Sequence, residues 1–306
     1  MLYLKTKQEN ENMVLNINTE AIINQLGKNN FLPGLYIVST PIGNLADISI
    51  RALSILALSD LILCEDTRNS RKLISKYGIT CTLKAFHKFN STKEIPNILN
   101  KLKSGLIISM ISDAGTPLIS DPGESIVKKC IDEKIKVFSI PGASSVLGGI
   151  VISGMDTSKF TFLGFIPKNK KLREQFLEQI IFSNETLIVY ESSKRIKSLL
   201  NYLNLHISDR EIVIVREMTK KNEEVIRGTI KYVNNLFFKR ESIKGEITVF
   251  INGGTFNKKN KFSNSEILSL INLYKKKYTD KEIVLKISNK LNVKKRTVYQ
   301  LIIDNK

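Results

Sequence analysis

The stretch that most constrains the fold of this chain is LIISMIS at residues 106–112, followed at once by DAGTP at 113–117. The apolar run has neither a helical nor an alternating period and ends at turn-forming residues, which is typical of a strand buried on both faces of a parallel sheet. In open α/β sheets, ligands bind just beyond the carboxyl ends of the strands. The loop with Asp113, Ala114, Gly115 and Thr116 therefore predicts a ligand site. An ordinary strand exit is the alternative interpretation.

Other short apolar runs in the first half also end in loops rich in Pro, Gly, Ser, Thr or acidic residues. Strands are expected at 35–39, 61–64, 83–86 and 137–140, and their exits include TPIGN, EDTR and PGASS. Helices are expected between them, one from about residue 48 capped by Asp47, one near 71–76, one opened by a Ser91–Glu94 capping box and one that starts at 121–124 with Pro122 in its first turn. Strands that alternate with helices indicate a parallel α/β layer whose loops share one edge. We therefore predict an α/β domain at 34–145, preceded by a flexible N-terminal extension at 1–33.

The second half has a different pattern, with strands less regularly separated by helices. Strands are expected at 160–166, 186–190, 212–216, 223–227 and 246–251, with a helix at 230–238. This pattern predicts a second α/β domain with a mixed sheet at 146–254. A linker follows, and residues 262–306 predict a small module of three helices. Its middle helix is opened by a Thr279–Glu282 capping box, and the whole has the layout of a helix-turn-helix.

Charge is unevenly distributed along the chain. The net charge is +18, and residues 257–306 contain 13 Lys and Arg against 4 Asp and Glu, so half of the excess lies in the last fifty residues. A concentrated basic segment favours a polyanion partner, most often nucleic acid. Lys294, Lys295 and Arg296 open the third helix and are the candidate contacts to such a polyanion there. The alternative is a lysine-rich composition that only keeps the surface soluble.

Several classes of protein are excluded or disfavoured. The sequence has no P-loop, no G-x-G-x-x-G after a strand and no Ser/His/Asp set, so we expect neither a P-loop nucleotidase, nor a Rossmann dinucleotide site, nor a hydrolase. With two histidines and three widely spaced cysteines, we expect no metal site and no disulfide framework. No apolar run approaches the length of a membrane span, and a cytoplasmic protein is expected.

The loop motifs, taken in order, resemble those of the bacterial ribosomal RNA small subunit methyltransferase I family, in the tetrapyrrole methylase superfamily. They are LYIVSTPIGNL at 35–45, EDTR at 65–68, SDAGTPL at 112–118, DPG at 121–123, YES at 190–192, REMTK at 216–220 and KGE at 244–246. Each motif is weak alone, but their common order is specific. The resemblance covers residue 34 to the C-terminus.

The resemblance implies two α/β domains of the tetrapyrrole methylase type, with S-adenosylmethionine in the cleft between them, and the C-terminal helical module. It implies 2′-O-methylation of a cytidine ribose in the decoding region of small-subunit (16S) ribosomal RNA, with the RNA or the 30S particle as partner and a homodimer as the assembly. The cofactor residues it implies are Thr40, Pro41, Ile42, Asp113, Ala114, Gly115, Thr116, Ala143, Ser144, Tyr190, Glu191 and Glu246.

Catalytic and RNA-binding roles are also expected near these loops. A ribose hydroxyl is a poor nucleophile, so a base or hydrogen-bond acceptor assists it, and Glu65 and Lys220 are the catalytic candidates. Arg68 and Arg216 are candidates for holding RNA phosphate. For each Glu–Arg grouping, a structural ion pair is an equally weighted alternative.

Two other functions fit parts of the sequence. One is a methylase of the same fold that acts on a tetrapyrrole or another small molecule, which the basic C-terminal module and the EDTR and YES motifs argue against. The other is a ribosome-binding assembly factor without turnover, which cofactor binding would distinguish from both enzymes.

Overall fold

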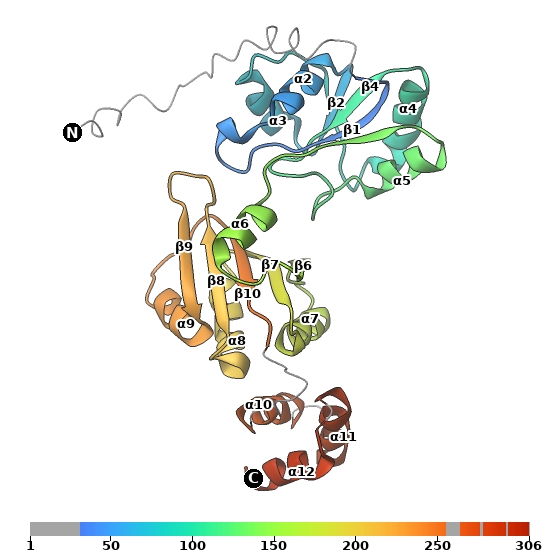
Figure 1. The fold of residues 1–306 in the computed structure, drawn as a ribbon. Coiled ribbons are helices and arrows are strands. Elements are labelled where there is room, and N and C mark those ends of the chain that lie inside the picture. Colours follow the sequence, from blue (N-terminus) through green and yellow to red (C-terminus); the bar gives the residue numbers. More distant parts are fainter. Residues whose placement is uncertain (1–30, 255–263, 276–277, 292, 306) are drawn as a thin grey trace, which may run out of the picture. The chain divides into compact units, whose positions relative to one another are not determined.

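The computed structural model describes residues 31–254, 264–275, 278–291 and 293–305, and these form two compact units divided between Ser145 and Val146 (Figure 1). The N-terminal extension expected at 1–33 and the linker before the C-terminal helices lie almost entirely outside the described residues.

The first unit is a five-stranded, fully parallel sheet with the strand order β3-β2-β4-β1-β5. Its strands are β1 Gly34–Val38, β2 Leu61–Cys64, β3 Leu83–Ala85, β4 Ile107–Met110 and β5 Val137–Ile140. Its helices are the 3₁₀ turn η2 Leu45–Asp47, α2 Ile50–Leu58, α3 Thr67–Ser75, α4 Ser91–Lys103 and α5 Glu124–Asp132. The predicted parallel α/β layer is confirmed.

Helices cover both faces of this sheet, and successive residues of each strand point alternately into the hydrophobic core on one face and the core on the other. Tyr36 and Ile62 pack with α2 and α3, whereas Leu35 and Leu63 pack with α4 and α5. Figure 1 shows these two pairs of helices on opposite sides of the sheet. The central strand β4 is buried as its apolar run predicts, and its one polar side chain, Ser109, shares a 2.7 Å hydrogen bond with the Ser59 hydroxyl. A buried hydroxyl is tolerated in a strand when it has such a partner.

The second unit contains a mixed sheet with the order β6-β7-β10-β8-β9, in which only the β6–β7 pair is parallel. Its strands are β6 Phe160–Phe165, β7 Thr186–Ser192, β8 Glu211–Arg216, β9 Glu224–Thr229 and β10 Glu246–Ile251. The helices around it are α6 Ser145–Ser153, α7 Lys170–Phe182, α8 Ile196–Ile207 and α9 Ile230–Phe238. On one face α6 packs over Ile188 and Phe250, and the other face carries α7, α8 and α9.

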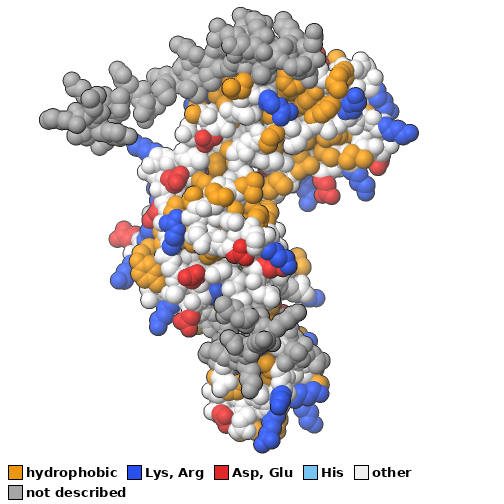
Figure 2. Space-filling view, in the orientation of Figure 1, with side chains coloured by type: hydrophobic (Ala, Val, Ile, Leu, Met, Phe, Trp, Pro, Cys, Tyr) orange, Lys and Arg blue, Asp and Glu red, His pale blue; other side chains and the backbone are white. Residues whose placement is uncertain are grey.

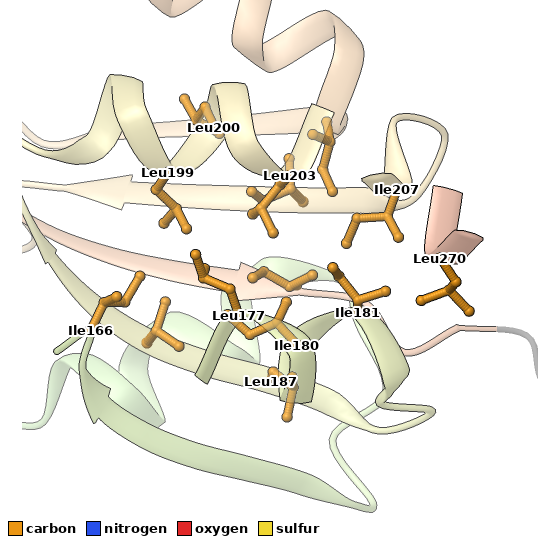
Figure 3. Close-up of a cluster of buried hydrophobic side chains, with 14 of the residues drawn as sticks. Ile166, Leu177, Ile180, Ile181, Leu187, Leu199, Leu200, Leu203, Ile207 and Leu270 are labelled. Atoms are coloured by element: carbon orange, nitrogen blue, oxygen red, sulfur yellow. The ribbon is translucent and has the colours of Figure 1, made fainter. Parts of the chain in front are cut away.

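The three C-terminal helices, α10 Asn264–Lys275, α11 Asp280–Leu291 and α12 Lys295–Ile303, extend this second core. Figure 3 shows Leu270 of α10 beside Ile207 of α8, next to Ile181 of α7. Tyr274 is buried in the same cluster, and burial raises its pKa to about 12. The basic helices are therefore attached to the second domain through an apolar contact.

Several predicted helix starts were wrong, and each has a local cause. Ser49, not Asp47, caps α2, because its hydroxyl accepts from the Ala52 N–H at 3.1 Å. Ser91 does not cap α4, since the preceding Asn90 takes the cap position and its amide bonds back to residues 85 and 87. Pro122 precedes α5, which begins at Glu124.

Other differences concern helices that the sequence pattern left out or placed late. Helix α3 begins at Thr67, directly after its cap Asp66, and α6, α7 and α8 were not anticipated. The capping box of α11 is confirmed, with the Thr279 N–H donating to the Glu282 carboxylate at 2.8 Å and the Glu282 N–H donating to the Thr279 hydroxyl at 3.5 Å.

Candidate functional site

The first candidate site lies where the loops after β1 and β4 meet. These strands are neighbours, but the chain leaves them in opposite directions along the sheet, toward β2 after β1 and toward β5 after β4. Such a switch point is where open α/β sheets bind ligands. Thr40, Pro41 and Ile42 follow β1, and Asp113, Ala114, Gly115 and Thr116 follow β4.

The two loops are joined by hydrogen bonds. The Thr40 and Gly115 backbones exchange N–H donations at 2.8 and 3.1 Å, and the Thr40 hydroxyl donates to the Ser112 carbonyl at 3.2 Å. The Ser39 and Thr116 hydroxyls are 2.9 Å apart. Thr40 is buried, so its side chain serves the loop pairing. The loops are thus rigid, as a pre-formed site requires.

Gly115 has a conformation and surroundings that leave little room for a side chain. Its φ is +78°, and an added Cβ would lie 3.3 Å from the Ile42 Cγ2 and 3.8 Å from the Ala143 carbonyl oxygen. The loop after β5, with Ala143 and the adjacent Ser144, therefore borders the same place. All the cofactor residues expected in the first domain are brought together.

Carboxylates border this edge of the sheet. Glu65 is exposed at the end of β2, and Asp113 is exposed and accepts from the Asn69 amide at 3.1 Å. Asp121 is partly buried in the loop after β4. Burial raises its pKa to about 6, the charges of Glu65 and Asp113 contribute to the increase, and a hydrogen bond with Ser112 opposes it. Asp121 belongs to the DPG motif at 121–123 and to the expected helix start, but it was not among the predicted site residues, although an acidic residue beside Pro and Gly in a site loop was a usable signal.

Arg68 belongs to the same edge of the first domain. Its guanidinium donates to both oxygens of Asp66, at 3.2 Å from Nε and 2.9 Å from the terminal nitrogen. The hydrogen bond from Arg68 lowers the pKa of Asp66 to about 2. The Arg68 side chain remains largely exposed. The ion pair is therefore present, and it leaves the guanidinium accessible to an anion.

In the second domain, Tyr190 and Glu191 lie at the end of β7. The Tyr190 ring packs against Phe162 and Phe165, with centroids 4.9 and 5.2 Å away. The Glu191 side chain is fully buried, and its Oε1 accepts from the Arg195 guanidinium at 2.7 Å and from the Ser192 N–H at 2.6 Å. This carboxylate is engaged inside the domain and fixes the end of β7. Arg195, its partner, was not singled out in the sequence.

Lys220 lies between two carboxylates. Its Nζ donates to Glu217 Oε1 at 2.9 Å and to Glu246 Oε2 at 3.0 Å, and Glu217 also accepts from the Glu246 N–H at 2.9 Å. Partial burial opposes its charge, but the hydrogen bonds to Glu217 and Glu246 prevail, and the pKa of Lys220 is raised. Lys220 is thus held protonated. A base needs a pKa near the working pH, so this geometry favours an electrostatic role.

The loop that carries Lys220 has unusual backbone geometry. Glu217 and Thr219 have φ values of +52° and +64°, although neither is glycine. Gly245 faces this loop with φ +94°, and an added Cβ would lie 2.4 Å from the Glu217 Cγ. Such backbone strain clusters at functional sites. The REMTK and KGE motifs are therefore two parts of one packed unit.

Arg216 is engaged within the same domain. Its Nε donates to the Glu224 carboxylate at 2.9 Å, and Arg240 binds the same carboxylate. The hydrogen bond from Arg240 lowers the pKa of Glu224 to about 2, with Arg216 contributing. The structural ion pair weighed for Arg216 is thus present. The role of Arg216 in RNA binding stays a prediction.

The C-terminal module presents basic side chains to solvent. Lys294 occupies the cap position of α12, Lys295 and Arg296 form its first turn, and all are exposed. Figure 2 shows Lys and Arg side chains gathered on one side of this module. Within the described ranges, no helix is long and apolar enough to span a membrane, and no group of His, Cys, Asp or Glu has a metal-binding arrangement.

Comparison with known proteins identifies relatives that match most of the length of this chain. The family model of the tetrapyrrole (corrin/porphyrin) methylases matches residues 34–234. The ribosomal RNA small subunit methyltransferase I of Thermotoga maritima is 44% identical over 219 residues, 72% of this chain and 98% of that protein. Its counterpart from Haemophilus influenzae is 38% identical over 268 residues, 87% of this chain and 95% of that protein.

Solved structures share the fold at low sequence identity. Diphthine synthase has a TM-score of 0.57 and 12% identity, covering 71% of this chain and 89% of that one. Uroporphyrin-III C-methyltransferase from Thermus thermophilus, solved with S-adenosylhomocysteine, has a TM-score of 0.50 and 13% identity, covering 71% of this chain and 96% of that one. The two α/β sheets predicted from the sequence are therefore those of a known fold.

Proposed function

The chain belongs to the ribosomal RNA small subunit methyltransferase I family of the tetrapyrrole methylases, and we propose that it methylates small-subunit ribosomal RNA with S-adenosylmethionine. The acceptor we propose is the 2′-oxygen of a cytidine ribose in the decoding region. The observation that carries the proposal is the 44% identity to the Thermotoga relative over nearly all of that protein.

The paired loops of the first domain fit this cofactor. Gly115 is buried between the paired loops, where an added side chain would press on Ile42 and Ala143, whereas Asp113 and Ala114 beside it are exposed. The acidic groups Asp113 and Asp121 suit a positively charged ligand. When bound, the cofactor supplies an electrophilic methyl group. The residues that hold it in this proposal are those after β1, β4 and β5, together with Tyr190 and Glu246, while Glu191 supports the end of β7.

Glu65 and Lys220 take different roles toward the ribose. Glu65 is exposed at the end of β2, and its carboxylate accepts the proton of the 2′-hydroxyl as the oxygen becomes a nucleophile. Lys220 is held as a cation by Glu217 and Glu246, so it stabilises negative charge on the RNA beside the reacting oxygen. Both groups act chiefly by position and charge, which suits a reaction that depends on alignment.

RNA binding uses cations outside these loops. Arg68 in the first domain and Lys294, Lys295 and Arg296 in the C-terminal module are exposed and contact phosphate in this proposal, with Arg216 as a further contact beside Glu224. The partner is the small-subunit RNA or the 30S particle, and the chain acts as a homodimer in the cytoplasm. The cytoplasmic assignment is supported by three free cysteines, whose pKa values burial raises.

The experiment that tests the function is methyl transfer with the purified full chain, labelled S-adenosylmethionine and small ribosomal subunits from a strain that lacks the modification. Incorporation of about one methyl group per subunit is expected. Cofactor binding without transfer would support the assembly-factor alternative, and transfer to a tetrapyrrole in place of RNA would support the small-molecule alternative. A Glu65→Gln variant controls for contaminating methylases, because its rate should fall well below that of the unmodified chain.

A further inference from the structure

The outward side of α12 combines basic residues with an exposed aromatic ring. The inward side of this helix carries Val298, Leu301 and Ile302, which are buried in the core of the second domain. The outward side carries solvent-exposed residues, and we call it the α12 outer face. It consists of Lys295, Arg296, Tyr299, Gln300 and Ile303.

Tyr299 is 52% exposed, so its ring is accessible to a ligand although the other side of the helix is packed. The other described tyrosines of the module are packed: Tyr274 is buried and Tyr278 lies beneath the Lys286 ammonium, 4.3 Å from the ring centroid. Tyr299 is therefore the ring that this module presents to solvent among its described residues.

The helix geometry places two cations beside this ring. Lys295 precedes Tyr299 by four residues and Arg296 precedes it by three, and side chains at these spacings lie on the same side of a helix. The acidic residue nearest the far end of the face, Asp304, accepts from the Gln300 amide at 2.9 Å. Lys294, exposed at the cap position, adds a further positive charge. The face is thus a ring flanked by positive charge.

We propose that the α12 outer face binds unpaired nucleotides of RNA, with a base stacked on Tyr299 and the flanking phosphates held by Lys295 and Arg296. An exposed aromatic ring between cations suits a single strand, because an unpaired base offers its flat face, whereas paired bases in a duplex are already stacked. This inference rests on the proposed function, because it specifies that the C-terminal helices bind a single-stranded part of the RNA substrate.

The chain contains no tryptophan, so Tyr299→Trp introduces a single fluorescent reporter at the stacking position. Titration of this variant with a short single-stranded RNA is expected to quench its emission, and the same sequence annealed to its complement is expected to leave it nearly unchanged. Phe238→Trp is the matched control, because Phe238 is exposed on α9, outside the module. Equal quenching by the duplex, or stronger binding to a DNA duplex, overturns the proposal.

Affinity measurements separate stacking from charge. Tyr299→Ala should weaken binding of the single strand by about 5- to 150-fold, the range expected for one stacked base, while Tyr299→Phe should retain most of the affinity. Lys295→Ala and Arg296→Ala should each reduce the slope of log affinity against log salt by about 0.7. Thermal unfolding of each variant checks that the module remains folded.

The outcomes distinguish this inference from the proposed function. If the wild-type chain binds the single-stranded RNA and Tyr299→Ala binds it with the same affinity, the stacking contact is overturned, whereas the proposed RNA methylation is not affected. Absence of any RNA binding by the wild-type chain overturns both.

Discussion

Thr40 and Gly115 exchange backbone hydrogen bonds at 2.8 and 3.1 Å, and this pairing joins the loops that follow two neighbouring strands at the switch point of the first sheet. The same geometry holds Gly115 at φ +78° beside Ile42 and Ala143. The proposed cofactor site therefore depends on the backbone of two loops more than on any one side chain. Rigid loops of this kind bind without a further ordering cost.

Gly115→Ala should weaken cofactor affinity by at least about tenfold, because the new Cβ enters the space between Ile42 and Ala143. The left-handed backbone also costs about 1 kcal/mol of stability. Gly78→Ala is the matched control, since Gly78 has φ +68° with nothing within 4 Å of an added Cβ. Calorimetry with the cofactor and thermal unfolding of both variants check this. Equal affinities would remove Gly115 from the site.

Lys220→Met should lower the methylation rate by about tenfold or more while cofactor affinity stays nearly constant, because the proposed function gives this charge a role toward the RNA acceptor and none toward the cofactor. Lys221→Met, at the exposed neighbouring position, should retain the wild-type rate. Since the pKa of Lys220 is raised, the rate should show no ionisation of this group at neutral pH. A rate loss shared equally by both variants would contradict the assignment.

Asp121 gives a prediction for stability against pH. Its pKa is about 6 in the folded domain against an ordinary value of 3.8, so between these values the folded state keeps a proton that the unfolded state has lost. Stability therefore falls as pH rises through this window, and the full loss is present above pH 6. Asp121→Asn should raise the unfolding midpoint at pH 7 by about 2–4 °C and leave it unchanged near pH 4.

Asp66→Asn provides the opposite case in the same domain. The pKa of Asp66 is lowered to about 2, so its carboxylate contributes stability that is present above the ordinary value of 3.8 and lost as pH falls. This variant should lower the midpoint at pH 7. A lower midpoint for Asp121→Asn as well would show that Asp121 is stabilising in its charged form.

Ile271→Ala should reduce the free energy of unfolding by about 2–4 kcal/mol, because this fully buried side chain of α10 lies in the core shared with the second domain. Leu285→Ala, at a partly exposed position of α11, should change it by less than about 1 kcal/mol. Chemical denaturation of both variants measures the difference.

Because α10 packs on α8, deletion of the whole C-terminal module would expose apolar surface of α8 to solvent. Charge substitutions within the module are therefore a cleaner probe of RNA binding than its deletion.

The regular elements were predictable wherever local pattern decides the structure. The strands Leu61–Cys64, Val137–Ile140 and Glu246–Ile251 and the helix Ile230–Phe238 have the boundaries expected from the sequence. Their apolar runs are bounded by turn residues, and the buried face fixes their period. The cap of α2 was misplaced because Asp47 and Ser49 are both good capping residues.

The pairings within the site were not predictable, because they join residues far apart in the sequence. The bond between Thr40 and Gly115 spans 75 residues, and that between Asn69 and Asp113 spans 44. The raised pKa of Lys220 depends on Glu217 and on Glu246, and the sequence assigned Glu246 only to the cofactor. Motifs identify which loops matter, whereas tertiary contacts decide which side chains remain available for chemistry.

The central claim is methylation of a ribose 2′-oxygen on a cytidine, and alkaline hydrolysis of the labelled RNA product tests it most directly. A methylated 2′-oxygen cannot attack the adjacent phosphate, so hydrolysis leaves the modified nucleotide in a dinucleotide. The account predicts that the label from small subunits treated with the purified chain appears in an alkali-resistant dinucleotide that begins with cytidine. Label recovered on a mononucleotide, which marks a methylated base, or in a dinucleotide that begins with another nucleoside, would contradict it.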